Sequence, residues 1–248
     1  SHQWGGPGIH GLMKDLRTIL NEYPGDRMLV GEDDNIEYLG SRNDELHLVF
    51  NFPLMRTDKI TPLHIRNNQA DRLKQLNKLN PQGWGCNTLG NHDSPRIYKR
   101  YGDGSSNDQY ARLNLVLLLT LPGVPFLYYG EEIGMSDLLI EDPTLLRDTM
   151  AIWYYNHLVD NLHIPKEEAA KYAGSMSRDK NRTPMQWTNS INAGFCPPHV
   201  TPWLPINTNY KLGVNVIEQE NQSTSLLNFY RNVLMIRKAI PALSQGDF

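Results

Sequence analysis

The chain has 248 residues, a formal net charge of −3 and a hydrophobic share of 40%. This composition is typical of a globular protein and argues against disorder or a fibre. The near-neutral charge provides no basic surface for nucleic acid or for an anionic membrane, so neither is expected as a partner. The longest apolar run, residues 113–121, is shorter than the roughly 20 residues that a membrane-spanning helix needs.

Two cysteines, Cys86 and Cys196, provide neither a disulfide framework nor the spacing of a metal site. They are compatible with a reducing compartment, and the cytoplasm is favoured. The chain opens at Ser1 without an initiator Met, a signal peptide or a transit sequence, and it ends at Phe248 soon after a helical pattern. We therefore expect an internal piece of a longer protein.

Four segments have the patterns of helices: apolar residues at helical spacing in the first and the last, a polar pattern in the second, and a buried, mostly apolar pattern in the third. The first is punctuated at its end by Pro24-Gly25 and the third by Pro122-Gly123, as is common just past a helix C-terminus. The predicted helices are Ile9–Leu20, Ile65–Leu79, Tyr110–Leu121 and Ser225–Ala239.

Short apolar runs between these helices predict strands that are buried on both faces. They are 28–31, Leu46–Phe52, Gly83–Leu89 and Val124–Tyr129. Their alternation with helices predicts an α/β fold with βα units and a parallel sheet. Residues 134–222 break this rhythm. They are rich in Pro, Asn and Gly and show only a weak helical pattern near Lys166–Tyr172, which predicts a long functional connection.

Polar clusters follow three of the predicted strands. Gly31 leads into Glu32, Gly90 leads into Asn91-His92-Asp93, and Gly130 leads into Glu131-Glu132. In a parallel barrel the carboxyl ends of the strands carry the active site, and carboxylates there can act as an acid/base or acid/nucleophile pair. Each cluster alone also fits a turn or a helix cap. For Glu131-Glu132 we favour a structural role at the N-terminus of a following helix.

Taken together and in order, these segments resemble the later motifs of glycoside hydrolase family 13, the α-amylase superfamily. A further block after the last strand resembles the α-glucosidase, oligo-1,6-glucosidase and maltase branch. The segments that carry the resemblance are Val30-Gly31-Glu32, Asn91–Arg96, Leu121–Met135, Ser177–Trp187, Asn192–Phe195, Trp203-Leu204-Pro205 and Asn215-Val216.

The resemblance implies the second half, strands five to eight, of a (β/α)8 TIM barrel with a long loop after strand eight. Four strands cannot close that barrel, so the domain is incomplete as given. The implied organisation is a half-barrel over 1–133, the long loop over 134–222, the last barrel helix over 223–240, and the start of a link to a missing C-terminal β domain over 241–248.

The resemblance also implies roles for four residues. Glu32 matches the general acid/base, which must stay protonated near neutral pH through burial or a neighbouring like charge. Asp93 matches the carboxylate that stabilises the transition state, and His92 matches a histidine that binds sugar hydroxyls. Arg182 matches an arginine that grips the non-reducing glucose together with an aspartate, a task that suits its planar fork of donors. The alternatives are a core histidine and a surface arginine.

The family's nucleophile is an aspartate in a Gly-x-Arg-x-Asp motif after strand four, ahead of the first strand of this chain. We expect no such motif here and assign no nucleophile. The family's strand-three Asn-His motif and the aspartate that partners Arg182 are likewise expected upstream. The metal sites of the family lie mostly in that missing half, so no metal is assigned, and no cofactor is expected.

The resemblance implies a retaining α-glucosidase that acts on short α-glucoside oligosaccharides. One alternative is a sucrose isomerase or transglucosylase on the same scaffold. Another is a non-catalytic relative such as the ectodomain of an amino-acid-transporter heavy chain. Three aromatic residues, Trp187, Trp203 and Tyr210, could line a sugar site, but we favour packing of the long loop onto the barrel.

Overall fold

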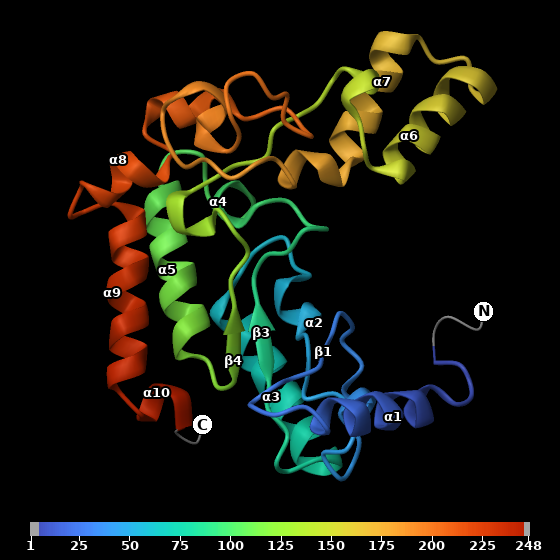
Figure 1. Ribbon diagram of the computed structural model, residues 1–248, viewed down its shortest axis with the longest axis vertical. Helices are drawn as coiled ribbons and strands as arrows, with labels where there is room; N and C mark the ends of the chain where they lie inside the picture. The colour runs from blue at the N-terminus through green and yellow to red at the C-terminus, as the bar shows by residue number, and fades with distance from the viewer. Residues whose placement is uncertain (1–4, 246–248) are drawn as a thin grey trace. The chain divides into compact units, whose positions relative to one another are not determined.

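The computed structural model describes residues 5–245, and the chain divides into two compact units. The first unit comprises residues up to Leu89, then Leu118–Phe126 and the segment from Arg237 onward. The second unit comprises Gly90–Leu117 and Leu127–Ile236. Figure 1 shows the elements in chain order.

Four long helices confirm the predicted helical segments, with ends displaced by a few residues. In α3, Pro62 occupies the first turn, where its missing N–H is not needed, and the Thr61 side chain accepts a hydrogen bond from the His64 N–H. The helices are α1 (Ile9–Asn21), α2 (Phe52–Met55), α3 (Pro62–Leu79), α4 (Ile97–Arg100), α5 (Asn107–Thr120), α6 (Thr149–Asn156), α7 (Lys166–Met176), α8 (Val216–Glu220), α9 (Leu226–Ala239) and α10 (Ala242–Gln245).

All four predicted strands are present in the first unit, and their pairing is parallel as predicted. They are shorter than the apolar runs that predict them: β1 (Val30–Gly31), β2 (Leu48–Val49), β3 (Cys86–Thr88) and β4 (Val124–Phe126). β1 pairs with β2. β3 pairs with β4, and Figure 1 shows these two strands side by side.

The described strands form two separate two-stranded sheets instead of the single sheet expected. The interruption falls at Asn51, between β2 and the start of α2. Its N–H donates to the Cys86 carbonyl at 2.7 Å, and its side chain donates to the Asn87 side chain at 2.9 Å. One backbone hydrogen bond and one side-chain hydrogen bond therefore stand in place of a continuous backbone ladder at this position, and the chain turns into α2 at Phe52.

A buried apolar cluster lies beneath β1 and β2 in the first unit and receives side chains from α1 and α3. Elsewhere in this unit, the Arg237 guanidinium of α9 donates to the Leu119 carbonyl and, at 2.8 Å, to the Gly123 carbonyl. Arg237 thus satisfies one carbonyl at the end of α5 and one in the turn that follows it. The cluster consists of Ile36, Tyr38, Leu39, Leu46, Val49 and Leu76.

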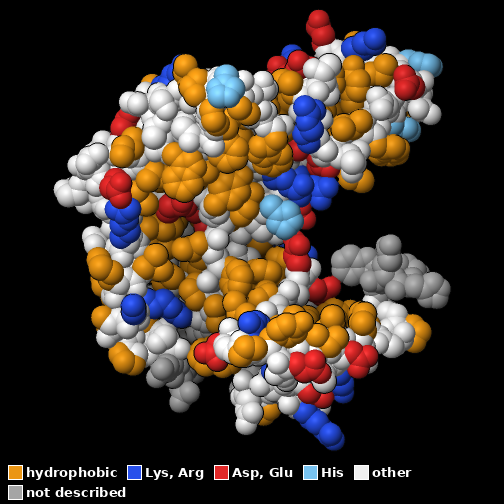
Figure 2. Space-filling view, viewed as in Figure 1, with side chains coloured by type: hydrophobic (Ala, Val, Ile, Leu, Met, Phe, Trp, Pro, Cys, Tyr) orange, Lys and Arg blue, Asp and Glu red, His pale blue; other side chains and the backbone are white. Residues whose placement is uncertain are grey.

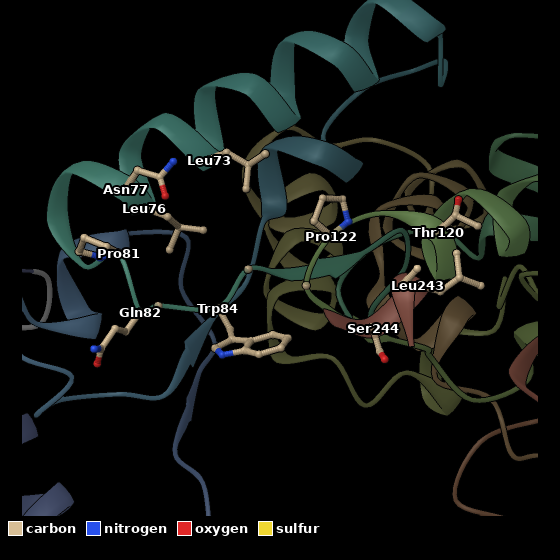
Figure 3. A pocket seen from close by; sticks show the side chains of 14 residues that line it. Leu73, Leu76, Asn77, Pro81, Gln82, Trp84, Thr120, Pro122, Leu243 and Ser244 are labelled. Atoms are coloured by element: carbon tan, nitrogen blue, oxygen red, sulfur yellow. The ribbon is translucent and has the colours of Figure 1, made fainter. Parts of the chain in front are cut away.

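A pocket of about 340 Å³ opens at the amino ends of β3 and β4 (Figure 3). Trp84 and Pro122 line it from the segments that precede the two strands, and Leu76 lines it from α3. The active sites of parallel barrels lie at the carboxyl ends of the strands, which is the opposite end. This pocket is therefore not a candidate for the catalytic site.

Gly123 is required by the tight turn that leads into β4. Its φ is +109°, and an added Cβ would lie 2.6 Å from the Gly85 carbonyl oxygen. We expect Gly123→Ala to lower the free energy of unfolding by about 2–3 kcal/mol, through backbone strain and a clash that the paired strands cannot relieve. Gly104→Ala is the matched control, since Gly104 also has a positive φ but has open space around its Cβ position. Urea unfolding curves measure both. Equal losses would show that only backbone conformation matters at Gly123.

Residues 134–222 contain more regular structure than their composition predicts. α7 extends the weak pattern near Lys166–Tyr172, but α6 was not predicted. Both pack around a buried apolar cluster of the second unit, made of Ile140, Leu146, Ala151, Ala173 and Leu204. Tyr210 is buried, as a packing role requires, whereas Trp187 and Trp203 are 48% and 49% exposed. The packing role is therefore supported for Tyr210 only.

Large hydrophobic side chains are exposed in both units, and Figure 2 shows broad orange areas on the face in view. Leu16 and Ile19 of α1 are 44% and 52% exposed in the first unit, and Leu113 of α5 is 63% exposed in the second. Within the described residues, no helix combines the length and the apolar character needed to cross a membrane.

Candidate active site

Glu32 follows β1 directly and is exposed at the carboxyl end of this strand. The two acids after it shape the turn that leaves the strand. Asp33 accepts a hydrogen bond from the Asn35 N–H at 2.7 Å, and Asp34 pairs with Arg56 at 2.6 Å. The first unit thus presents the predicted acid/base at the strand end where a barrel enzyme needs it, but without the burial expected of a protonated acid.

His92 and Asp93 follow β3 and lie in the second unit. The Asn91 side chain accepts a hydrogen bond from the Asp93 N–H at 3.1 Å, which closes a turn of the kind that Asn favours. His92 Nε2 lies 3.5 Å from Asp93 Oδ1, and both side chains are about two-fifths exposed. The turn therefore presents an imidazole and a carboxylate together toward solvent.

Two arginines converge on the Asp93 carboxylate from the segment after Ser177. Arg182 Nη2 lies 2.5 Å from Asp93 Oδ1, and Arg182 Nε donates to the His92 carbonyl at 2.8 Å. Arg178 Nη1 donates to the same Asp93 oxygen at 3.2 Å. Within the second unit, the structure thus brings together Asp93, His92 and Arg182. The two guanidinium groups make Asp93 a poor ligand for a cation and a suitable part of a site for neutral hydroxyls.

Arg178 was not singled out from the sequence, although it lies in the Ser177–Trp187 block. Its other guanidinium nitrogens contact Asp148, which is 5% exposed, at 2.9 and 3.0 Å. These hydrogen bonds hold the pKa of the Asp148 carboxyl down at about 2. The sequence offered one indication of this pair: Asp148 stands directly ahead of α6, as a helix-capping residue does. In the structure it accepts a hydrogen bond from the Met150 N–H as the cap of α6.

A buried arginine, Arg96, follows the His92-Asp93 turn in the chain and contacts the segment after β4. Arg96 is 2% exposed, and its Nη1 donates to the Tyr129 carbonyl at 2.6 Å. Its guanidinium lies 5.2 Å from the centre of the Tyr128 ring and 4.7 Å from that of Tyr129. The Tyr129 hydroxyl in turn donates to the Thr183 carbonyl at 2.7 Å. Tyr129, which Arg96 holds in place, therefore connects the segment after β4 to the segment that carries Arg182.

Glu131 lies at the start of a short helix, as the structural role expected for it requires, but its side chain is buried. It begins a single 3₁₀ turn, η2 (Glu131–Ile133), but it is only 4% exposed, and neither carboxylate oxygen has a hydrogen-bond partner among the described residues. Burial raises the pKa of Glu131 to about 8. The backbone near Tyr128 and the charge of Arg96 oppose this shift, and nearby Glu132 adds to it. The sequence could not show this burial, because it arises from packing with distant segments.

The raised pKa of Glu131 predicts a stability that depends on pH. The protonated form is favoured in the folded state, so this stabilisation is complete below the unfolded pKa of about 4.3 and is lost as pH rises toward 8. We expect the free energy of unfolding to fall by about 2–4 kcal/mol between pH 5 and pH 8, and Glu131→Gln to abolish most of this fall. Denaturant titrations at both pH values measure it, with the exposed Glu141→Gln as control. An unchanged fall in Glu131→Gln would assign the pH dependence to other groups.

The expectation that no Gly-x-Arg-x-Asp motif occurs is wrong, because Gly40-Ser41-Arg42-Asn43-Asp44 has that spacing. Its structural context differs from a motif at the carboxyl end of a strand. Asp44 precedes β2 by four residues and pairs with Lys14 of α1 at 3.3 Å. Because β1 and β2 are parallel, Asp44 lies before the amino end of this sheet and Glu32 lies past its carboxyl end. Asp44 is thus not placed to act as a nucleophile opposite Glu32.

The elements and the polar residues at their ends define part of a (β/α)8 catalytic domain. The family profile described as "Alpha amylase, catalytic domain" matches residues 1–246. The chain belongs to glycoside hydrolase family 13, in its oligo-1,6-glucosidase and α-glucosidase branch.

Curated relatives place the chain within this branch. The "Probable oligo-1,6-glucosidase 2" of Bacillus subtilis (strain 168) is 31% identical over 259 residues, which cover 98% of this chain and 45% of the relative. An α-glucosidase of Pediococcus pentosaceus is 30% identical over 263 residues, covering 98% of this chain and 46% of that protein. The chain therefore spans a little under half the length of these relatives.

Solved structures give the same picture of the fold. An isomaltulose synthase mutant from Erwinia rhapontici NX5, in complex with its natural substrate sucrose, matches with a TM-score of 0.81 at 31% identity. The trehalose-6-phosphate hydrolase of Bacillus licheniformis matches with a TM-score of 0.79 at 30% identity. Each match covers 98% of this chain and 45% of the other.

Proposed function

We propose that the whole protein is a retaining α-glucosidase that hydrolyses short α-glucoside oligosaccharides. The chain would supply strands five to eight of the barrel over residues 1–133, the long loop over 134–222, the last barrel helix over 223–240, and the start of a link to a further domain over 241–248. The remaining strands would come from a segment outside this chain. The exposed hydrophobic side chains of both units support this proposal, because a closed barrel would cover such surfaces.

The observation that carries the proposal is the cluster of Asp93, His92 and Arg182 after β3. In the proposed mechanism, Glu32 protonates the leaving oxygen and later activates water. Asp93 stabilises the positive charge that develops at the anomeric carbon, while His92 and Arg182 bind hydroxyls of the glucose. The nucleophile would come from the remaining half, because retention needs two carboxylates facing each other about 5–5.5 Å apart.

A second candidate is a sucrose isomerase or transglucosylase, in which the glucosyl group passes to a sugar instead of water. The likeness to the sucrose-bound isomaltulose synthase mutant supports it. The chain assembled with its remaining half distinguishes the two when it is incubated with maltose and with sucrose. Free glucose from maltose supports the glucosidase, whereas isomeric disaccharides from sucrose support the isomerase. Absence of turnover with both sugars would favour the non-catalytic scaffold.

Replacing Arg182 tests the role of the cluster in sugar binding. In the assembled domain, Arg182→Ala is expected to lower kcat/KM for short glucosides about 10²-fold, which corresponds to the loss of a charge-assisted contact of roughly 2–3 kcal/mol. Steady-state kinetics with maltose measure the effect. Arg66→Ala is the charge-matched control, because Arg66 is exposed on α3. Unchanged kinetics in Arg182→Ala would assign Arg182 to structure.

A further inference from the structure

Arg178 lies between the carboxylates of Asp148 and Asp93 and makes more hydrogen bonds to the first than to the second. Asp148 accepts three hydrogen bonds from it: from Nη2 at 2.9 Å, from Nε at 3.0 Å and from the backbone N–H at 2.9 Å. Asp93 accepts one, from Nη1 at 3.2 Å. Arg178 is thus anchored to Asp148 along one edge of its planar fork, and the remaining nitrogen points at Asp93.

The anchor is itself fixed by a reciprocal arrangement of two buried aspartates. Asp148 accepts the N–H of Arg178, and Asp179, 1% exposed, accepts the N–H groups of Arg147 and Asp148 at 2.6 and 2.9 Å. Each aspartate therefore holds the backbone beside the other. Because Asp148 also caps α6 through the Met150 N–H, its carboxylate has little freedom to rotate.

Arg182 has no comparable anchor among the described residues. It contacts Asp93 and the His92 carbonyl, both of which belong to the same exposed turn. If Arg182 turned toward a bound sugar, Asp93 Oδ1 would lose one of its two guanidinium partners. Arg178 would remain in place, because its position depends on Asp148.

We propose that Asp148 is a positioning residue that holds Arg178 as a fixed cationic partner of Asp93, so that Arg182 can exchange between Asp93 and a ligand. The geometry of the Asp148–Arg178–Asp93 chain stands independently of the reaction. The consequence for catalysis rests on the proposed role of Asp93 in the α-glucosidase.

Nuclear magnetic resonance of the full chain tests the geometry directly. In the unchanged chain, the Arg178 Nε–H should exchange with water at least about tenfold more slowly than that of exposed Arg66, because it is hydrogen-bonded to Asp148. Asp148→Asn should remove this protection and shift the carboxyl ¹³C signal of Asp93. Arg178→Gln should cause a similar Asp93 shift, and the double variant should add nothing further. The proposal would be overturned if the Asp93 signal did not shift in Asp148→Asn. It would also be overturned if the Asp93 shift in the double variant equalled the sum of the shifts in the two single variants.

Two controls separate positioning from a general loss of structure. Asp142→Asn removes another helix-capping aspartate, which accepts from the Thr144 N–H, and should leave the Arg178 and Asp93 signals unchanged. If Asp148→Asn does not fold, Arg178→Gln alone decides, since it leaves the Asp148 cap on α6 intact. It must shift the Asp93 signal without moving the indole signal of Trp153 in α6, and an unmoved Asp93 signal rejects the proposal.

Kinetics of the assembled domain test the catalytic consequence. Asp148→Asn should lower kcat about tenfold while changing KM less than twofold, because a displaced Asp93 acts on the transition state more than on ground-state binding. A tenfold rise in KM with kcat unchanged in Asp148→Asn would contradict the positioning role of Asp148. Inactivity of the unchanged assembled domain would reject the proposed function, while the resonance experiment would still decide whether Asp148 positions Arg178.

Discussion

Purified on its own, the chain is expected to show no turnover of a chromogenic α-glucoside, a loss of about 10⁴–10⁶ relative to the complete catalytic domain. The reason is chemical. In the proposed mechanism Glu32 protonates the leaving group and Asp93 stabilises positive charge, and the carboxylate that captures the anomeric carbon is supplied by the remaining half of the domain. Groups that act as a unit in such a site lose nearly all of their effect when one of them is missing.

Mixing the chain with its remaining half should restore turnover, and the same assay measures the gain. Asp44→Asn is the informative variant, since Asp44 closes the one Gly-x-Arg-x-Asp segment of this chain. We expect no effect of Asp44→Asn on the restored activity. Turnover by the lone chain that disappears in both Glu32→Gln and Asp44→Asn would instead identify Asp44 as a nucleophile and contradict the proposed division of the site.

In the assembled domain, Glu32→Gln is expected to lower kcat/KM for maltose about 10²–10⁴-fold, the usual contribution of a positioned acid/base. The loss should be smaller for the glycosylation step of a nitrophenyl glucoside, because this leaving group departs without a proton. Steady-state kinetics with both substrates measure the difference. Glu37→Gln is the control, since Glu37 is exposed in η1 (Ile36–Leu39), the turn after β1. Equal losses on both substrates would argue that Glu32 binds the sugar and does not protonate the leaving group.

The helices that the sequence predicted well are those with apolar residues at helical spacing and clear stop signals. α1, α3, α5 and α9 have regular apolar spacing and recognisable ends. α6 lacks that signal, because Met150, Ala151, Ile152 and the aromatic residues that follow make it apolar on every side. Strand positions were predictable from apolar runs. Strand lengths were not, because they depend on contacts such as those of Asn51 with Cys86 and Asn87.

The site residues adjacent to strand ends could be proposed from short motifs. The residues that support them could not, because their roles depend on pairs far apart in the chain. Arg178 meets Asp93 across 85 positions, and Arg96 meets the Tyr129 carbonyl across 33. An acidic residue looks the same in sequence whether it caps a helix, pairs with a cation or is buried. Asp148 caps α6 and pairs with Arg178, while Glu131 is buried. Only burial and hydrogen-bond partners separate these roles.

The different origins of the residues around Asp93 have an evolutionary consequence. His92 and Asp93 take their position from the end of β3, so three residues of chain suffice to place them. Arg182 and the half-exposed Trp187 and Trp203 come from a segment in which long irregular stretches separate the helices, and such stretches tolerate insertion and exchange. In the proposed α-glucosidase, lengthening that segment would change which sugars fit beside Arg182 while leaving the strand that precedes Asp93 unchanged. Substrate preference can therefore diverge in this fold faster than the chemistry it serves.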